Sequence, residues 1–99
     1  MEDRTKEHVE HDRVRSRYEL TVDGVVGAYA EYEDAGGARV FTHTVTVPAM
    51  RGRGLAGKLV RHALDDARAE ERTVVPHCWY VAQYIDQHPQ YADLLAAGA

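Results

Sequence analysis

A glycine-rich basic loop is the feature of this sequence whose residue types and spacing most clearly suggest chemistry. It reads Arg51-Gly52-Arg53-Gly54-Leu55-Ala56-Gly57-Lys58 and opens an amphipathic segment. Glycine lets a backbone approach a ligand without a Cβ in the way. The first turn of a helix carries unpaired N–H groups and a partial positive charge. The loop is therefore a candidate site for a phosphate or pyrophosphate group, although Lys58 is equally consistent with a solvated helix residue.

Two known phosphate-binding motifs match this loop only in part. The loop of nucleotide triphosphatases needs a hydroxyl side chain after Gly-Lys, whereas Leu59 follows Lys58 here. Gly52, Gly54 and Gly57 have the G-x-G-x-x-G spacing of a dinucleotide fingerprint. That fingerprint also needs an acidic residue about 20 positions further on, and residues 73–76 contain none.

Cys78, the one cysteine in the sequence, is a second candidate for chemistry. It follows a predicted strand, and its thiolate could act as a nucleophile or its thiol as an acid. Trp79 and Tyr80 would shape an apolar pocket beside it. The alternative is a buried cysteine that acts only as a small apolar side chain.

His43 is a third candidate, because its alternation with Phe41 and Val45 predicts that it shares their side of a strand. There it would be a hydrogen-bonded core residue or a general base. His77 ranks below it, because residues adjacent in an extended segment point to opposite faces and His77 is next to Cys78. A zinc site of His43, His77 and Cys78 lacks the paired spacing of structural sites, so no metal is predicted. Tyr84 is expected to pack between helices or to line a cofactor channel.

These residues must be positioned by the elements around them. Residues 1–12 are charged and rich in histidine, which predicts a flexible arm, and residues 13–99 are predicted to form a single domain. Alternating patterns predict antiparallel strands at 14–22, 25–32 and 39–47, with turns at Asp23-Gly24 and at 34–37. Gly27 suggests a bulge or a close approach.

The second half of the sequence predicts helices around one further strand. Apolar spacing predicts a helix from Leu55 to about Glu71, a strand at 73–75 parallel to the third, a helix at 79–87, and a short helix or turn at 91–97. The fold class is therefore α+β, with a mixed sheet of three antiparallel strands and a parallel fourth.

Composition limits the classes of function. The formal net charge of -4 argues against a broad nucleic-acid surface. No apolar run approaches the roughly 20 residues of a membrane span. A single cysteine allows no internal disulfide, which favours a reducing cytoplasm. The small domain with an uncovered sheet edge is equally consistent with a monomer and a homodimer.

The pattern Arg51-x-x-Gly54-x-Ala56 resembles the acyl-CoA signature of the GCN5-related N-acetyltransferases (the GNAT superfamily). The resemblance extends from Tyr18 to Leu95 and is closest to the short YjdJ-type acetyltransferase-like subgroup. Beyond the loop it rests on three further segments, Thr42-His43-Thr44, Pro76-x-Cys78-x-x-Val81 and His88-Pro89-x-Tyr91.

This resemblance implies an acyl-CoA site and an N-acyltransferase activity. The amides of the loop would hold the CoA pyrophosphate, and pantetheine would enter between the third and fourth strands. The implied cofactor-binding residues are Val45, Val47, Arg51, Gly52, Arg53, Gly54, Leu55, Ala56, Gly57, Lys58, Cys78 and Tyr84. An acetyl or short acyl group would pass from acetyl-CoA to an amine, with His43 as base and Cys78 as nucleophile or acid.

The sequence leaves the acceptor open among a protein lysine, an N-terminal amine, a polyamine and a small metabolite. The alternative function is a CoA-binding or acyl-CoA-binding module with little or no turnover.

Overall fold

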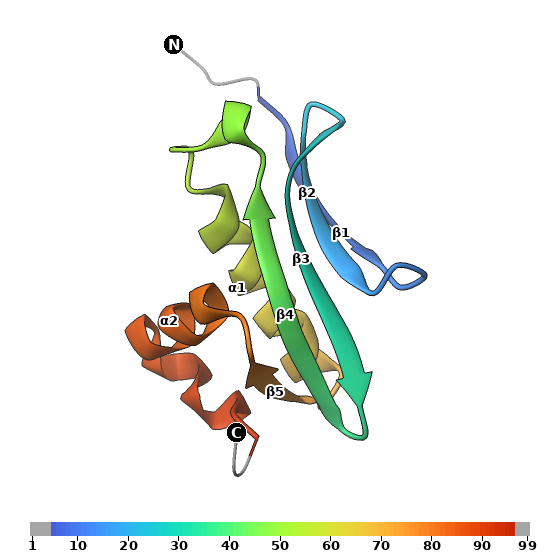
Figure 1. Ribbon diagram of the computed structural model, residues 1–99, viewed down its shortest axis with the longest axis vertical. Helices are drawn as coiled ribbons and strands as arrows, with labels where there is room; N and C mark the ends of the chain where they lie inside the picture. The colour runs from blue at the N-terminus through green and yellow to red at the C-terminus, as the bar shows by residue number, and fades with distance from the viewer. Residues whose placement is uncertain (1–4, 97–99) are drawn as a thin grey trace.

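An antiparallel meander of four strands forms the N-terminal half of the fold in the computed structural model, which describes residues 5–96 (Figure 1). A short fifth strand lies parallel to the fourth, and the spatial order is β1-β2-β3-β4-β5. The α+β class and the mixed sheet are confirmed, with one strand more than predicted. The strands are β1 (Glu7–Asp12), β2 (Arg17–Val22), β3 (Val25–Ala35), β4 (Ala38–Thr46) and β5 (Thr73–Pro76).

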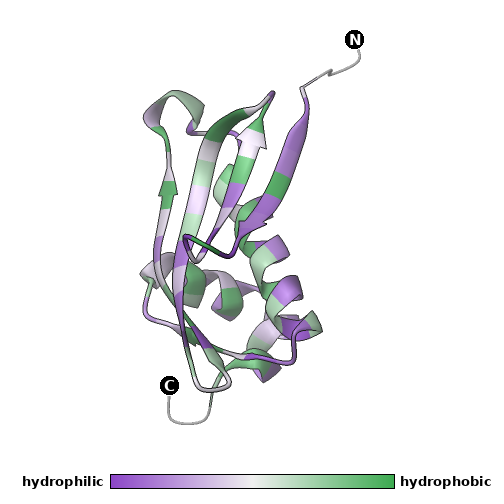
Figure 2. Cartoon of the chain, turned by 90° about the vertical axis from the view of Figure 1, so that its right-hand side faces the viewer, coloured by the Kyte–Doolittle hydropathy of each residue, from purple (hydrophilic) through white to green (hydrophobic). Residues whose placement is uncertain are grey.

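The additional strand is β1, where a flexible arm was predicted. For the described residues of that segment the prediction is wrong, while residues 1–4 lie outside the described part. β1 pairs antiparallel with β2, the side chain of Val9 packs against the core, and the ring of His11 stacks on Tyr18 with centroids 4.2 Å apart. Because β1 is mostly hydrophilic (Figure 2), few apolar side chains take part in these contacts. The composition of the strand is that of a solvated tail.

The start of β2 also differs from the prediction. The alternating pattern suggested a strand from Val14, but β2 begins at Arg17. Val14 is 97% exposed, and Ser16 has a φ of 52°, in the left-handed region that turns use. The predicted turn at Asp23-Gly24 is confirmed, since φ is 51° and 83° at its two residues, as a type I′ turn requires.

Two α-helices and two 3₁₀ helices complete the fold. They are η1 (Pro48–Met50), α1 (Leu55–Ala69), α2 (Trp79–Gln87) and η2 (Pro89–Leu94). The bounds of the α-helices agree closely with the sequence pattern, whereas η1 was not predicted and η2 begins two residues before the predicted 91–97 segment. After η2 the chain returns to the sheet, where the amide of Ala96 donates to the carbonyl of Val74 (3.0 Å). Within residues 5–96 no helix is long and apolar enough to cross a membrane.

Both α-helices cover the same face of the sheet, here called the inner face. The core combines Tyr18, Leu20, Ala30 and Phe41 of the sheet with apolar side chains of both helices. The helix side chains are Leu55, Leu59, Val60, Ala63, Leu64 and Ala67 of α1 and Val81 and Ile85 of α2. The opposite, outer face carries the alternate residues of the strands.

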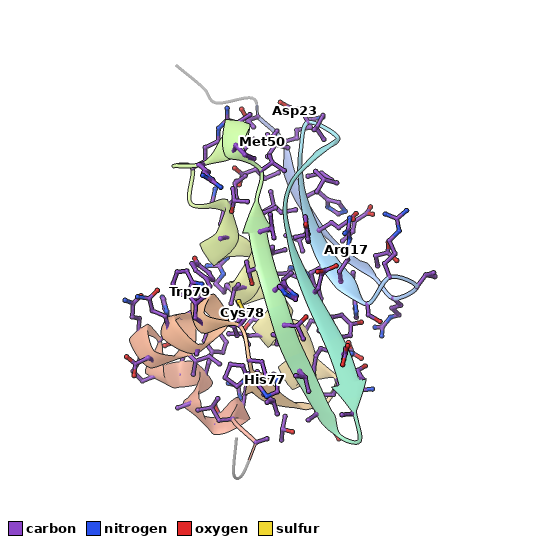
Figure 3. The ribbon with its side chains drawn as sticks, in the orientation of Figure 1. Arg17, Asp23, Met50, His77, Cys78 and Trp79 are labelled. Atoms are coloured by element: carbon purple, nitrogen blue, oxygen red, sulfur yellow. The ribbon has the colours of Figure 1, made fainter. Side chains whose placement is uncertain are left out.

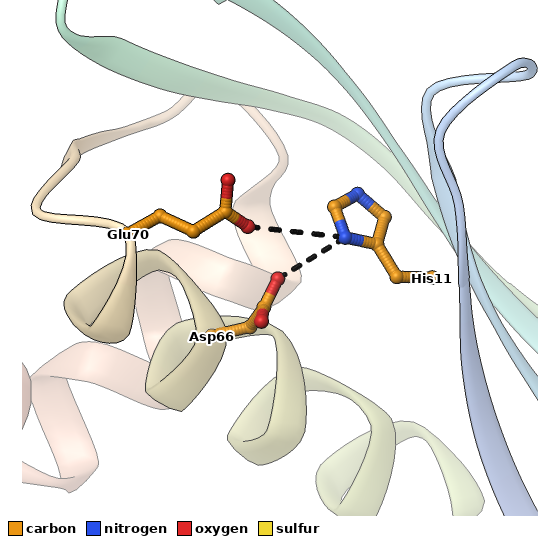
Figure 4. A group of neighbouring side chains, drawn as sticks. All are labelled: His11, Asp66 and Glu70. Atoms are coloured by element: carbon orange, nitrogen blue, oxygen red, sulfur yellow. Dashed lines mark ion pairs between the residues drawn. The ribbon is translucent and has the colours of Figure 1, made fainter.

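A buried polar network joins β1, β2 and β4 to the C-terminal half of α1. Arg39 is 1% exposed, and its guanidinium donates to the hydroxyl of Tyr18 (2.6 Å) and to Glu70 (3.2 Å). Tyr18 donates in turn to Asp66 (2.5 Å). His11 Nδ1 lies 3.2 Å from Asp66 and 3.9 Å from Glu70 (Figure 4).

The charge balance of this network favours a structural role. His11, Asp66 and Glu70 are close enough to surround a cation. However, a guanidinium nitrogen of Arg39 already lies 3.6 Å from Asp66 and 3.2 Å from Glu70. Burial lowers the pKa of His11, and the positive charges of Arg13 and Arg39 lower it further. At neutral pH a neutral His11 therefore ties the edge strand to α1.

Candidate functional site

The sheet opens where β4 loses its parallel neighbour. β4 and β5 pair from Ala38 with Thr73 to Phe41 with Pro76. One further backbone hydrogen bond follows, from the amide of Cys78 to the carbonyl of Phe41 (2.9 Å). β4 then continues to Thr46 while the chain after β5 turns into α2 (Figure 1). The backbone of β4 beyond Phe41 is thus free of a β5 partner.

A hollow of about 420 Å³, here called the inner hollow, lies beside this free part of β4. It is lined by Thr44, Val45, Thr46, Arg51, Ala56, Trp79 and Tyr80. Cys78 borders it, because its thiol contacts the hydroxyl of Thr44 (Sγ to Oγ1, 3.5 Å). Cys78 is buried at the start of α2, whereas the neighbouring Trp79 is 73% exposed (Figure 3).

The glycine loop forms one end of the inner hollow. Gly52 and Gly54 have φ of 83° and 72°, where a Cβ would be strained, and an added Cβ would meet open space at both. Gly54 is the N-cap of α1, so no side chain caps the helix, and its first turn contains no acidic residue. The amides that begin α1 are therefore available to an anion. No carboxylate of the described residues forms an ion pair with Arg51 or Arg53.

Gly27 holds the loop against the sheet. The pairing of β2 with β3 shifts by one residue between Leu20 and Thr21, which leaves Gly27 as the extra residue and confirms the predicted bulge. A Cβ on Gly27 would lie 2.6 Å from Sδ of Met50 and 2.9 Å from Cδ1 of Leu55. The close approach therefore requires glycine and fixes both ends of the loop.

A second bulge changes the position of His43. Tyr32 pairs with Phe41 but Glu31 pairs with His43, so Thr42 is an extra residue of β4. An extra residue reverses the faces of the residues that follow it. His43 therefore lies on the outer face, 71% exposed and 3.7 Å from Glu31, and the prediction that it shares the side of Phe41 is wrong.

The same bulge turns Thr44 and Thr46 to the inner face, where they line the inner hollow. These two residues were missed by the sequence prediction, because uninterrupted alternation assigns them to the opposite face. The bulge also separates His43 from Cys78, which contacts Thr44 from the inner side, so the two do not converge with His77 on a zinc ion.

The remaining predicted cofactor residues divide into two groups. Arg51, Ala56 and Val45 line the inner hollow, but Val45 pairs with Tyr29 and its side chain lies on the outer face with His43. The side chains of Lys58, Tyr84 and Leu55 make contacts away from the inner hollow. Lys58 pairs with Glu7 of β1 (2.6 Å), the ring of Tyr84 stacks on His88 at 3.9 Å, and Leu55 is buried in the core.

Val47 and Gly57 were also predicted to bind the cofactor, and the contacts of both concern their backbone. Val47 precedes η1, and its amide donates to the carbonyl of Gly27 (2.9 Å). Gly57 faces α2, where an added Cβ would lie 3.6 Å from the hydroxyl of Tyr80. His77 lines a separate hollow of about 450 Å³ beyond β5.

A mixed sheet that opens between parallel strands, next to a glycine loop and an uncapped helix, is the arrangement expected of a class of protein that binds an elongated ligand with an anionic end. A family model described as GCN5-related N-acetyl-transferase matches residues 17–94. The chain belongs to this family. The match is at the level of the family, and the narrower YjdJ-type resemblance stays a prediction.

Relatives of similar length support the assignment. The chain is 35% identical to Protein NATD1 of Xenopus tropicalis, covering 88% of this chain and 84% of the relative. It is 36% identical to Protein NATD1 of Homo sapiens, covering 88% and 80% of the two chains.

Solved structures share the fold at low sequence identity. A GCN5-like protein from Staphylococcus aureus has a TM-score of 0.70 at 14% identity, covering 90% of this chain and 87% of that one. The ribosomal-protein-S18-alanine N-acetyltransferase of Escherichia coli has a TM-score of 0.62 at 17% identity, covering 73% and 50%.

Proposed function

We propose that this chain is an acetyl-CoA-dependent N-acetyltransferase that acts on an amine. The observation that carries the proposal is the inner hollow, which opens where β4 leaves β5 and ends at the glycine loop. Membership of the GCN5-related family supports the same activity.

The residues around the inner hollow suit an acyl-CoA. The amides from Arg51 to Gly57 would hold the pyrophosphate, because Gly52 and Gly54 keep that surface free of side chains. Arg51 lines the hollow and would add positive charge near the phosphates. The free backbone of β4 beyond Phe41 would bind the amides of the pantetheine arm as a neighbouring strand would.

The reaction needs a base for the amine and a proton for the sulfur that leaves. The nitrogen lone pair of the amine attacks the thioester carbon, a C–N bond forms, and the C–S bond breaks with its electrons passing to the CoA sulfur. His43 would take the proton that the amine nitrogen loses. Cys78 would protonate the CoA sulfur, and the thiol hydrogen bond to Thr44 favours this acid role over nucleophilic attack.

Cofactor binding can be tested with two matched glycine variants. Calorimetry should show saturable binding of CoA and acetyl-CoA to the wild type and little or none to Gly54→Glu, which puts a carboxylate at the phosphate position. Gly36→Glu is the control, because Gly36 also has a positive φ of 59° and open space around it but lies in the β3–β4 turn. A folded wild type that binds neither ligand would refute the proposal.

Turnover can be tested with His43→Gln and Cys78→Ser. Both variants should retain CoA binding and lose between about a hundredfold and ten-thousandfold in kcat, the range that general acid–base residues supply. Saturable CoA binding without transfer to any amine would instead favour the binding-module alternative. The side chain of His43 is 71% exposed on the outer face, and this exposure is the observation that favours the binding-module alternative.

A further inference from the structure

A second hollow, here called the outer hollow, lies on the outer face of the sheet next to His43. Its volume is about 440 Å³, and its lining residues are Arg15, Ser16, Glu31, Tyr32, Glu33, Thr42 and His43. Thr42 and His43 border the outer hollow, and the next residue, Thr44, lines the inner one. The two hollows are therefore separated by the thickness of one strand at the point where that strand is bulged and free of β5.

The two hollows have opposite charge. The inner hollow contains Arg51, whereas the outer hollow contains Glu31 and Glu33. The one basic residue that lines the outer hollow, Arg15, has its guanidinium directed to Asp12 at 3.8 Å. Glu31 lies 3.7 Å from His43, so Glu33 is the carboxylate of the outer hollow that remains for a ligand.

The surrounding outer face strengthens this negative field. Alternation along β1 and β2 puts three carboxylates on the outer face, of which Asp12 is paired with Arg15 (3.8 Å) and Glu19 with Arg17 (2.6 Å), so Glu10 adds a further negative charge there. A field of this sign concentrates cations near the hollow and lowers the local concentration of anions.

We infer that the acceptor is a small aliphatic diamine or polyamine, with one amine at His43 and a second, charged ammonium at Glu33. The inference rests on the proposed function, which it deepens by naming the acceptor class. The reacting amine must lose its proton before it attacks, and His43 takes that proton. The second ammonium keeps its proton and pairs with Glu33.

The spacing of the two groups sets the length of the acceptor. Glu31 is paired with His43 across the strands, and Glu33 is two residues further along β3 on the same face. Glu33 is therefore a diagonal cross-strand neighbour of His43, and such neighbours lie about 7–8 Å apart. The five bonds between the nitrogens of 1,4-diaminobutane span roughly 6 Å, from bond lengths of about 1.5 Å. A four-carbon or five-carbon diamine therefore fits.

Three four-carbon amines that differ only in the distal group test the inference. We would measure kcat/KM with acetyl-CoA and 1,4-diaminobutane, butylamine or 4-aminobutyrate, whose distal groups are an ammonium, a methyl and a carboxylate. The wild type should prefer the diamine to butylamine by about tenfold or more and should use 4-aminobutyrate least. Glu33→Gln should lower the diamine-to-butylamine ratio about two- to fivefold, the effect of one exposed ion pair.

Glu10→Gln is the matched control, because it removes the same charge from the outer face of β1, away from the residues that line the outer hollow, and it should lower the ratio much less than Glu33→Gln does. Glu31 is not altered, since it contacts the base itself. A lysine peptide is assayed in parallel, and turnover of the peptide without the diamine would overturn the small-molecule assignment.

The outcomes separate this inference from the proposed function. Equal transfer to all three amines would overturn the inference, and so would a diamine-to-butylamine ratio that Glu33→Gln leaves unchanged. Either result would leave the proposed transferase activity standing. For the case of no turnover, NMR titration of the CoA-bound protein with 1,4-diaminobutane gives the second readout. Shifts confined to residues 31–33 and 42–43 would support the cation site and refute the transferase, and their absence would overturn both.

Discussion

Replacement of Glu70 by glutamine tests whether an ionised carboxylate at the end of α1 stabilises the fold. Burial alone would raise the pKa of Glu70, but hydrogen bonds from Arg13 and Arg39 outweigh it and lower the pKa from its ordinary value of 4.5 to about 2. Each unit of pKa corresponds to about 1.4 kcal/mol, which sets an upper bound of about 3 kcal/mol on the stabilisation.

Screening by solvent makes the stabilisation smaller than this upper bound. The Glu70 side chain is 24% exposed and that of Arg13 is 64% exposed, so water screens part of the interaction. Glu70→Gln keeps one carbonyl oxygen that accepts from Arg39, but it removes the charge and the second oxygen, since both oxygens of Glu70 accept from Arg13 and Arg39. We therefore expect it to lower the free energy of unfolding by about 1–2 kcal/mol at pH 7.

The pH dependence of this difference gives the sharper test. A carboxyl whose pKa is lowered in the folded state stabilises the fold fully above its unfolded pKa, and loses that contribution as the pH falls through the folded value. The difference between wild type and Glu70→Gln should therefore be constant from pH 7 to about 5.5 and should shrink between pH 4.5 and 2.

Urea unfolding followed by circular dichroism at pH 7, 5, 4 and 3 would measure this difference. Glu71→Gln is the control, because Glu71 is adjacent and exposed and carries the same charge. Its effect should stay within about 0.5 kcal/mol. A difference for Glu70→Gln that is below that value at pH 7, or that does not shrink in acid, would refute the role assigned to the ionised carboxylate.

Three further predictions concern packing, pH and the faces of β4. Gly27→Ala should cost about 1–3 kcal/mol in urea unfolding through its clash with the side chain of Met50, and Met50→Ala in the same chain should recover part of it. The pKa of His11 is lowered by burial and by nearby arginines, so the wild type should lose stability as the pH falls below about 6.5, and His11→Phe should lose less over the same range. His43→Lys should cost less than about 0.5 kcal/mol and Thr44→Lys several times more by thermal unfolding, and the reverse order would mean that β4 is not bulged at Thr42.

Much of the fold could be predicted from the sequence because its signals are local. The turn at Asp23-Gly24 depends on two residues that accept a positive φ, and the helix at 55–69 depends on apolar spacing along one segment. The glycine loop could be placed for the same reason, since its position before a helix is a property of consecutive residues. Such features need no knowledge of which distant segments meet.

The edge strand β1 could not be predicted, because what orders it lies elsewhere in the chain. Val9 is its one aliphatic residue, and much of its stabilisation comes from pairing with β2 and from His11 against Tyr18 and Asp66. In sequence, histidines among charged residues are typical of a solvated tail. The carboxylates that lie beside this partly buried histidine are more than fifty positions away in the sequence.

The candidate site shows the same limit at the scale of a single residue. The sequence predicts that His43 and Cys78 serve one site, but a count of alternating residues cannot detect the extra residue at Thr42, which is defined only by the register of β4 against β3. That residue puts His43 with the acidic outer hollow and puts Thr44 with Cys78 and the inner hollow. An imidazole on one side of a strand and a thiol on the other would suit the proposed transfer if the acceptor and the thioester approached from opposite faces. The bulge thus makes the arrangement more consistent with separate roles as base and acid than with a Cys–His nucleophilic pair, which would need both side chains on one face.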